Sequence, residues 1–276
     1  MELGIGGKVA LVTGAGQGMG QAISLGLAAE GVKVTVNDLS IEKANETVQL
    51  IQQQGGEAMA VSGDVSSKDD AEANVAACVD RFGAIDILVN NAGIESHFLV
   101  EHMPHDVWDR TIGVTLNSAF NYCKAVIPHM KKSGKGKIVA IGSVACFRLS
   151  ASGGSDYTAA KHGLLGLCKH LSIELGQYGI NVNVVCPGLT VTPNFLERYT
   201  EQETEDLMGG MPIGRLSRPE DIADAVLFMV SERADMITGQ SLVVDCGIIQ
   251  IVERDYQADI KGRVELSKRT MEQGKT

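Results

Sequence analysis

The stretch Thr13-Gly14-Ala15-Gly16-Gln17-Gly18-Met19-Gly20 decides the fold that this sequence predicts. An apolar run of strand length, residues 8–12, precedes it, and residues 21–30 follow with apolar side chains at helical spacing. The glycines therefore lie where a buried strand passes into a helix, and they permit positive φ and close backbone approach. Bare N–H groups at the positive end of that helix suit the diphosphate of a dinucleotide. A glycine-rich turn can also be a simple connection, so later residues must decide.

Composition narrows the classes of protein to which the chain can belong. Its 276 residues, 44% hydrophobic with 32 glycines, fit a compact α/β enzyme. No apolar run reaches the roughly 18 residues that span a bilayer, and the N-terminal residues lack signal-peptide features, so we expect a cytoplasmic protein with no membrane partner. Six scattered cysteines predict reduced, mostly buried thiols, and we expect no bound metal. The formal charge of −10 argues against a nucleic-acid partner.

Strand and helix signals alternate along the chain without a linker. The strand signals lie at 8–12, 33–38, 58–61, 85–89, 137–141, 181–185 and 241–244. The helix signals lie at 21–30, 40–54, 67–82, 106–130, 156–178 and 219–230. This alternation predicts an α/β fold, with residues 1–276 forming a single doubly wound Rossmann domain whose seven-stranded parallel sheet carries helices on both faces.

Two segments interrupt the alternation. An insertion at about 189–216 follows the carboxyl end of a predicted strand, where open α/β sheets bind ligands, so we interpret it as a lid. A tail, 248–276, extends beyond the last strand. Its apolar front, Ile248, Ile249, Ile251 and Val252, is too large to leave exposed, and we expect it to dock on the lid or on a neighbouring subunit.

Asp38 ends the second predicted strand, 18 residues after Gly20. A carboxylate at this place can accept hydrogen bonds from both hydroxyls of an adenosine ribose, and it repels a 2′-phosphate. Positions 17, 37 and 39 carry no Lys or Arg that could bind such a phosphate. Taken alone, Asp38 could be a solvated turn residue, but next to the glycine-rich turn it predicts NAD as the cofactor.

Tyr157 and Lys161 stand four residues apart and therefore share one face of a helix. A free tyrosine, with a pKa of about 10, is a poor base at neutral pH. A fixed ammonium in a partly desolvated cleft can favour the phenolate, so we expect Lys161 to lower the pKa of Tyr157. Ser143, just after the fifth predicted strand, can donate a hydrogen bond to a substrate oxygen.

The order of these features resembles the short-chain dehydrogenase/reductase family over about residues 5–247. The matching motifs are Thr13-Gly14-x-x-x-Gly18-x-Gly20, Asp64-Val65, Asn90-Asn91-Ala92-Gly93, Ser143, Tyr157-x-x-x-Lys161, Pro187-Gly188 and Thr192. The resemblance implies an NAD-dependent oxidoreductase that interconverts a secondary alcohol and a ketone by hydride transfer. Tyr157 would be the acid/base, Ser143 would position the reacting oxygen, and Lys161 would hold the nicotinamide ribose. Relatives are mostly homotetramers and less often dimers.

The resemblance also implies which residues contact the cofactor. Asp64 and Val65 would flank the adenine, Asn90 would steady the strand beside the cofactor, and Thr192 would meet the carboxamide. The full set is Gly14, Gln17, Gly18, Met19, Gly20, Asp38, Asp64, Val65, Asn90, Tyr157, Lys161, Pro187, Gly188, Thr190 and Thr192.

The chain departs from the family pattern at two places. Thr115 stands where relatives carry a catalytic Asn, and Asn117 cannot replace it because two residues turn a helix by about 200°. A Thr hydroxyl in a helix tends to bond a carbonyl of its own helix. The substitution leaves an alternative open, a non-catalytic partner subunit of a heteromeric dehydrogenase. Ser143 also precedes Tyr157 by 14 residues, one more than is usual.

The substrate side is less defined by the sequence. We expect a small, mostly apolar molecule bound by residues of the loops and the lid: His97, Ala145, Phe147, Phe195 and Tyr199. The alternative is a solvated loop position for His97 and simple lid packing for the aromatic residues. His162, next to Lys161, is expected to face away from the cofactor.

Overall fold

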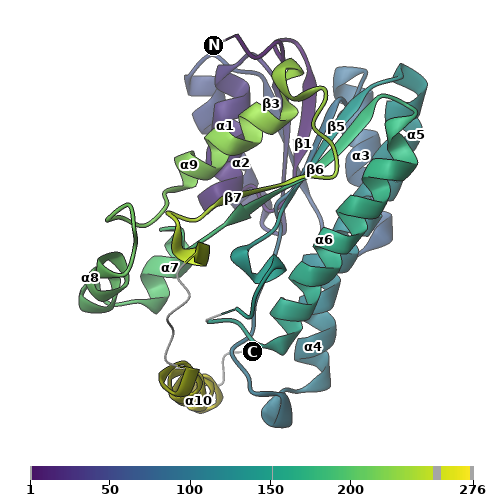
Figure 1. Cartoon of the computed structure of the whole chain (residues 1–276). Coiled ribbons are helices and arrows are strands. Elements are labelled where there is room, and N and C mark those ends of the chain that lie inside the picture. The colour runs from purple at the N-terminus through teal and green to yellow at the C-terminus, as the bar shows by residue number, and fades with distance from the viewer. Residues whose placement is uncertain (1, 151, 251–255, 274–276) are drawn as a thin grey trace.

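The computed structural model of the chain describes all residues except 1, 151, 251–255 and 274–276. Among the described residues, seven parallel strands form one sheet in the order β3-β2-β1-β4-β5-β6-β7 (Figure 1). The strands are β1 (Val9–Val12), β2 (Lys33–Asp38), β3 (Ala58–Ser62), β4 (Ile87–Asn90), β5 (Gly136–Ile141), β6 (Ile180–Pro187) and β7 (Ser241–Val244). The predicted doubly wound sheet is confirmed.

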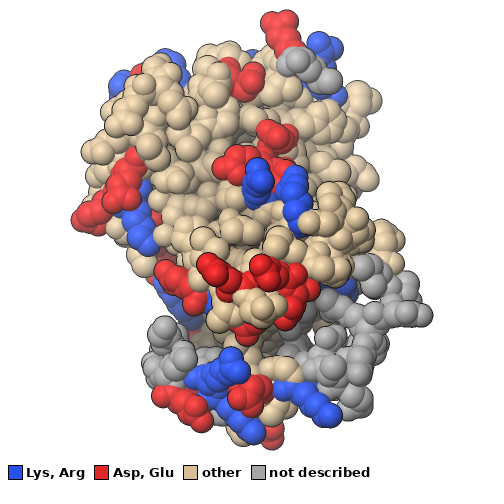
Figure 2. All heavy atoms as spheres, turned by 90° about the vertical axis from the view of Figure 1, so that its left-hand side faces the viewer, with Lys and Arg blue, Asp and Glu red and all other residues tan. Residues whose placement is uncertain are grey.

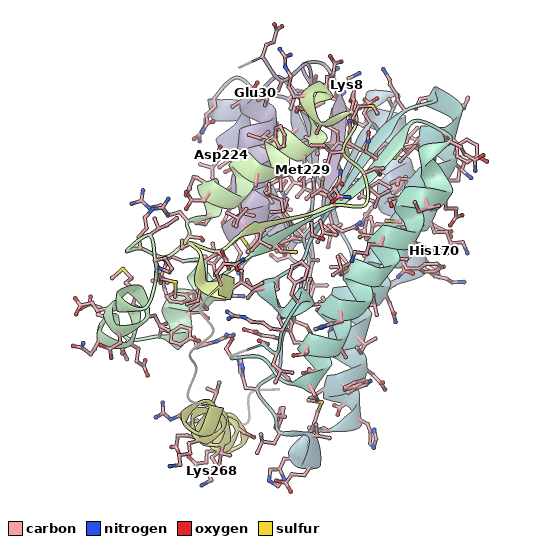
Figure 3. The ribbon with its side chains drawn as sticks, in the orientation of Figure 1. Lys8, Glu30, His170, Asp224, Met229 and Lys268 are labelled. Carbon is pink, nitrogen blue, oxygen red and sulfur yellow. The ribbon has the colours of Figure 1, made fainter. Side chains whose placement is uncertain are left out.

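Helices cover both faces of the sheet (Figure 1). One layer contains α1 (Gly18–Ala29), α2 (Ile41–Gln53) and α9 (Pro219–Val230), and the other α3 (Lys68–Phe82), α5 (Ser118–Ser133) and α6 (Ser155–Gly176). Alternate residues of a strand enter opposite cores, as Leu11 and Val12 do, because side chains alternate across the pleat. In the same way α9 buries Met229 against the sheet and exposes Asp224 (Figure 3).

Local sequence signals account for the helix ends. Ser40 and Ser67 accept hydrogen bonds from the third residues of α2 and α3, as their positions predict. Gly83 ends α3 with φ +80°, a conformation that suits glycine. Short turns of 3-10 helix, η1 (Val100–His102), η3 (Val144–Cys146), η4 (Glu232–Ala234) and η5 (Ile248–Gln250), connect the larger elements.

The predicted long helix at 106–130 is divided in the structure. Helix α4 (His105–Ile112) passes into a π-helical segment, η2 (Gly113–Asn117), before α5 begins. Thr115 in this segment bonds the backbone of Ile94 and not that of its own helix. The widened turn therefore accompanies a side chain that is directed at the loop after β4, and π-helical turns of this kind recur at functional sites.

The order of the strands places the ligand cleft. β1 has β2 on one side and β4 on the other, so the chain reverses its direction of travel across the sheet at this point. Loops that leave the carboxyl ends of β1 and β4 diverge there, and a crevice opens between them. The Thr13 hydroxyl closes its base by accepting hydrogen bonds from the backbone N–H groups of Asn91 and Ala92.

The insertion after β6 forms two helices, α7 (Pro193–Arg198) and α8 (Glu201–Gly209). Phe195, Met211 and Leu216 form its small core, against which Ile248 at the front of the tail packs. This contact agrees with docking of the tail on the lid, whereas Ile251 and Val252 lie outside the described residues. Helix α10 (Tyr256–Gln273) follows.

Helix α10 lies beside the lid and the loop after β4 (Figure 1). The Ser267 hydroxyl accepts a hydrogen bond of 3.3 Å from the Leu99 N–H. Acidic side chains gather on the lid above the charged side chains of α10, among them Lys268 (Figures 2 and 3). None of the described helices combines the length and the apolar character needed to cross a membrane.

Candidate active site

The glycine-rich turn leaves no room for side chains. Gly14 and Gly18 adopt φ values of +59° and +58°, which disfavour other residues. A Cβ on Gly14 would lie 2.9 Å from the Ala92 Cα, and one on Gly20 would lie 2.5 Å from the Asn91 Nδ2. The turn thus brings bare backbone to the bottom of the crevice between β1 and β4.

The first turn of α1 differs from those of α2 and α3 because no side chain caps it. Gln17 occupies the N-cap position without a side-chain hydrogen bond to the helix, and the first turn carries no acidic residue. The first N–H groups of a helix need partners, and the positive end of the dipole attracts anions. This uncapped end at a glycine cradle fits the diphosphate of a dinucleotide.

The cleft that begins at this turn is lined by residues from both halves of the sheet. Eight residues predicted to contact a cofactor line it: Gly14, Gln17, Gly18, Met19, Asp38, Asp64, Val65 and Thr192. The sequence did not predict six other lining residues, because none of them belongs to a recognisable motif: Leu39, Gly63, Ile94, Arg110, Val114 and Asn194.

Asp38 is fixed at the rim of the cleft by backbone donors. Its Oδ2 accepts a hydrogen bond of 3.0 Å from the Gly16 N–H, and its Oδ1 accepts one of 3.1 Å from the Ser40 N–H. A cation also lies near this rim, although positions 17, 37 and 39 carry none. Lys43, in the first turn of α2, donates from Nζ to the Gln17 Oε1 at 2.9 Å.

Asp64 and Arg110 form an ion pair at the adenine end of the cleft predicted from the resemblance. The Arg110 Nη1 lies 2.6 Å from the Asp64 Oδ2, and Ser66 donates to the Asp64 Oδ1 through its N–H and its hydroxyl. Burial raises the pKa of Asp64, but the bonds from Ser66 and the charge of Arg110 outweigh it and leave this pKa lowered. Arg110 comes from α4, 46 residues away, so sequence spacing could not reveal it.

The resemblance implied that Asn90 steadies the strand beside the cofactor, and in the structure Asn90 and Asn91 share this role. Asn90 is buried and donates from Nδ2 to the Cys123 Sγ at 3.5 Å, so it ties β4 to α5. Asn91 lines the cleft, and its Nδ2 donates to the carbonyls of Thr13 and Gly14 at 2.9 Å each. The brace of the glycine turn is therefore Asn91, and Asn90 does not line the cleft.

Ser143, Tyr157 and Lys161 meet beside the cleft. The Ser143 side chain lies next to Tyr157, whose pKa it lowers, and its hydroxyl accepts a bond of 3.1 Å from the Ala145 N–H. The Lys161 Nζ lies 5.5 Å from the centre of the Tyr157 ring and donates to the Ile141 carbonyl at 2.6 Å. The extra residue between Ser143 and Tyr157 is thus accommodated without separating the two side chains.

The electrostatics at Tyr157 differ from the expectation. Burial raises the pKa of Tyr157, the charge of Glu95 raises it further, and the Ser143 hydrogen bond opposes them. Burial also lowers the pKa of Lys161. The pKa of the phenol is therefore raised and not lowered as expected, because burial and the charge of Glu95 outweigh the groups that lower it.

Thr115 is buried at the end of this site and uses its hydroxyl on the loop after β4. Its Oγ1 donates to the Ile94 carbonyl at 2.9 Å and accepts from the Ile94 N–H at 3.1 Å. The expected bond to its own helix is not formed. Gly93 lies between the two groups, since its Cβ position would be 3.6 Å from the Lys161 Nζ and 3.7 Å from the Thr115 Oγ1. Thr115 thus fixes the loop against which Lys161 packs.

The residues between β6 and the lid have separate roles. Thr192 caps α7 by accepting a bond of 3.3 Å from the Phe195 N–H, and its Cγ2 would lie 3.4 Å from a Cβ on Gly18. It therefore faces the glycine turn. Pro187 ends β6, the Gly188 N–H donates to the Val244 carbonyl at 2.9 Å, and Thr190 is buried and pairs with Ser217. These three hold the base of the lid to the sheet.

Most of the proposed substrate-contacting residues have structural partners. Phe195 is buried in the lid core and stacks on Tyr199 with ring centres 4.6 Å apart, so lid packing explains it better than substrate contact. Ala145 is buried below Ser143. Phe147 remains exposed.

His97 and His162 line a second hollow, whose wall at Gly153 lies next to the Tyr157 ring. His97 is half-buried, and its Nδ1 lies 2.8 Å from the Ser152 carbonyl, so the ring is held by the loop after β5. His162, exposed on the same side, bonds the Thr158 carbonyl and faces away from the cofactor cleft, as expected.

A family model described as enoyl-(acyl carrier protein) reductase matches residues 14–249. The BbsD subunit of (2S)-[(R)-hydroxy(phenyl)methyl]succinyl-CoA dehydrogenase from Thauera aromatica is 38% identical, over 89% of this chain and 97% of its own length. A cyclohexanol dehydrogenase from Acinetobacter sp. strain SE19 is 39% identical, over 86% of this chain and 93% of its own. The chain belongs to the short-chain dehydrogenase/reductase family. It is an oxidoreductase of that family, as the resemblance implied.

A solved short-chain dehydrogenase/reductase shares the fold closely. The 7α-hydroxysteroid dehydrogenase complexed with NADH and 7-oxo glycochenodeoxycholic acid superposes with a TM-score of 0.85 at 33% identity. The match covers 91% of this chain and 98% of that one. The family binds a nicotinamide cofactor, and the uncapped helix at the glycine cradle fits one.

Proposed function

We propose that this short-chain dehydrogenase/reductase interconverts a secondary alcohol and a ketone with NAD, on a small-molecule substrate. The observation that carries the proposal is the contact between Ser143 and Tyr157 beside the cleft, with the buried Lys161 behind them. A hydroxyl, a phenol and an ammonium in this arrangement can bind one oxygen atom and move one proton to or from it.

Bound NAD would supply the acceptor or donor of a hydride. The Ser143 hydroxyl would donate a hydrogen bond to the substrate oxygen and hold it against Tyr157. The Tyr157 Oη would give its proton to a ketone oxygen as the alcohol forms, or remove the proton of an alcohol in the reverse direction. Since burial and Glu95 raise the pKa of Tyr157, the phenol carries its proton at neutral pH and can give it to a ketone oxygen as a hydride reduces the carbonyl carbon.

The preference for NAD over NADP rests on Asp38. Its carboxylate faces the cleft and would meet the ribose hydroxyls, whereas a 2′-phosphate would bring two negative charges against it. The NADH in the complex of the 7α-hydroxysteroid dehydrogenase supports the same cofactor. Lys43 at the same rim is hydrogen-bonded to Gln17. Its positive charge would attract a 2′-phosphate and thus reduce the preference for NAD over NADP.

An active enzyme is favoured over a non-catalytic subunit. The two hydrogen bonds between Thr115 and Ile94 hold the loop beside Lys161, so the replacement of Asn leaves the site assembled. The partner-subunit alternative rests on the replacement of Asn by Thr115 and on the relative BbsD, which is itself a subunit of a dehydrogenase.

We further propose that the chain assembles as a homotetramer or dimer, with a hetero-oligomer as the alternative. Large apolar side chains on the outer helices support this, since Phe120 on α5 is 52% exposed and Ile173 on α6 is 83% exposed. Light scattering of the purified protein measures the assembly directly.

The test of the activity uses NADH with a panel of ketones, and NAD with the matching secondary alcohols, followed by absorbance. Tyr157→Phe removes the proton donor and should lower turnover by about 10²- to 10⁴-fold while cofactor binding is retained. If the unmodified protein binds NAD but Tyr157→Phe changes no rate with any substrate, the non-catalytic reading is correct.

A further inference from the structure

An ion pair joins the lid to the loop after β4 on the substrate side of the site. The Arg198 Nη1 on α7 contacts the Glu95 Oε1 closely, and their side chains are only 26% and 20% exposed. Ion pairs at this depth cost desolvation energy, and they are weak evidence of stability in themselves. The position of this ion pair in the molecule is therefore a better indication of its role than its contribution to stability.

The pair stands next to the catalytic phenol. The Glu95 Oε2 and the Tyr157 Cδ1 lie 2.9 and 3.0 Å from one point, the position of a Cβ on Gly153. The charge of Arg198 also acts on Tyr157. A substrate whose oxygen is bound by Ser143 and Tyr157 would thus extend as far as Arg198.

A second arginine approaches the lid from the opposite loop. The Arg148 Nη1, five residues after Ser143, donates to the Ile248 carbonyl at 3.5 Å. Ile248 belongs to the same small lid core as Phe195 and Tyr199. Two guanidinium groups, those of Arg198 and Arg148, therefore stand next to the small apolar core of the lid.

The chemistry of the guanidinium indicates which ligand it would take. Arg presents five N–H donors in a planar fork that matches a carboxylate, and a single Nη1 contact to Glu95 leaves part of that fork for another acceptor. Tyr199 lies next to the Arg198 guanidinium and, like Glu95, raises its pKa. Glu95 neutralises the buried cation while no ligand is bound.

We propose that Arg198 binds a carboxylate of the substrate, with Glu95 as its resting counter-ion, so that the enzyme selects ketones and alcohols that carry an acid group on a mostly apolar body. The inference rests on the proposed function of the site beside it. The competing explanation is a latch in which the pair only holds the lid closed.

The test uses two ketones of the same shape, 4-acetylbenzoate and neutral 4-acetylbenzamide. Their binding to the Tyr157→Phe protein with NADH is measured by calorimetry, so no turnover is needed. We expect the benzoate to bind about ten- to hundredfold more tightly than the benzamide, as a charge-assisted hydrogen bond allows. Arg198→Gln should abolish this difference, and Arg198→Lys should retain part of it.

Two further variants separate a receptor from a latch. Glu95→Gln leaves Arg198 without its counter-ion. If Arg198 is the receptor, this variant should bind the benzoate more tightly. If the pair is only a latch, the variant should bind both probes more weakly. Arg215→Gln is the matched control, because Arg215 pairs with Asp221 in the first turn of α9, outside the cleft, and its loss should leave the preference unchanged.

The inference is overturned if the two probes bind equally, if the benzoate does not bind, or if Arg198→Gln keeps the preference. Failure of the proposed function gives a different result. In that case the benzoate still binds in an Arg198-dependent manner, but the protein with Tyr157 intact reduces neither ketone. Thermal unfolding of each variant verifies that the compared proteins are folded.

Discussion

Removal of the Thr115 hydroxyl is the sharpest test of how the site is held together. Thr115→Val keeps the shape of the side chain and deletes both hydrogen bonds to Ile94, of 2.9 and 3.1 Å. Thr115→Ser is the matched control, since it keeps the hydroxyl and loses only a methyl group. The comparison separates hydrogen bonding from packing at one buried position.

The expected magnitude follows from the two bonds. A typical internal hydrogen bond contributes about 1 kcal/mol, and a buried backbone group left without a partner costs about 1–3 kcal/mol. Because Ile94 lies at the partly exposed rim of the cleft, water can replace part of the loss. We therefore expect Thr115→Val to lower the free energy of unfolding by about 2 kcal/mol, and Thr115→Ser by about 1 kcal/mol.

Turnover should respond more strongly than stability. Gly93 packs between Thr115 and Lys161, so a displaced loop disturbs the ammonium behind Tyr157. A shift of about 1 Å in an active site can reduce the rate by about a hundredfold. Because the loop should move by less than that, we expect Thr115→Val to lower turnover by about tenfold. Thr115→Asn should retain or raise turnover, since Asn can also donate and accept.

The measurements are urea unfolding followed by circular dichroism and initial rates with saturating cofactor. If Thr115→Val unfolds at the same urea concentration as Thr115→Ser and turns over at the wild-type rate, the two bonds to Ile94 do not hold the site. In that case the role of Thr115 inferred from the structure is wrong.

Three other predictions follow from residues at the cleft, the lid and the tail. Asp38→Ala should weaken NAD binding by about 1–3 kcal/mol and NADP binding far less, as measured by fluorescence titration; equal use of both cofactors by the unmodified protein contradicts it. The hydrogen bond and charge of Arg215 lower the pKa of Asp221 to about 2, so its stabilising effect is complete above its unfolded pKa near 4 and is lost as the pH falls through about 2. Asp221→Asn should therefore lower the unfolding free energy at pH 7 by about 1 kcal/mol, a value reduced by the exposure of Arg215, and urea unfolding should show this difference shrinking between about pH 4 and 2. Ending the chain after Gly247 removes Ile248 from the lid core and should lower the oligomer mass or the activity; unchanged light scattering and rates would show that the tail has neither role.

Local sequence signals determined the fold and the catalytic group. The alternation of strand and helix, the caps Ser40 and Ser67 and the glycines at 14, 18 and 20 depend on neighbours within a few residues, so they can be recognised in the sequence. The four-residue spacing of Tyr157 and Lys161 is likewise a local property of one helix. The family resemblance rested on these same local motifs.

Only the tertiary structure decided the partners of those residues. Arg110 meets Asp64, Glu95 meets Arg198, and Thr115 meets Ile94, each across 21 residues or more of chain. No periodicity or motif joins such positions, because the loops and the π-helical turn that bring them together are set by packing. The charge beside Tyr157, and with it the raised pKa of the phenol, could therefore not be predicted from the sequence. Glu95 reaches the site through the loop after β4, and the course of this loop depends on how the neighbouring strands and the lid pack.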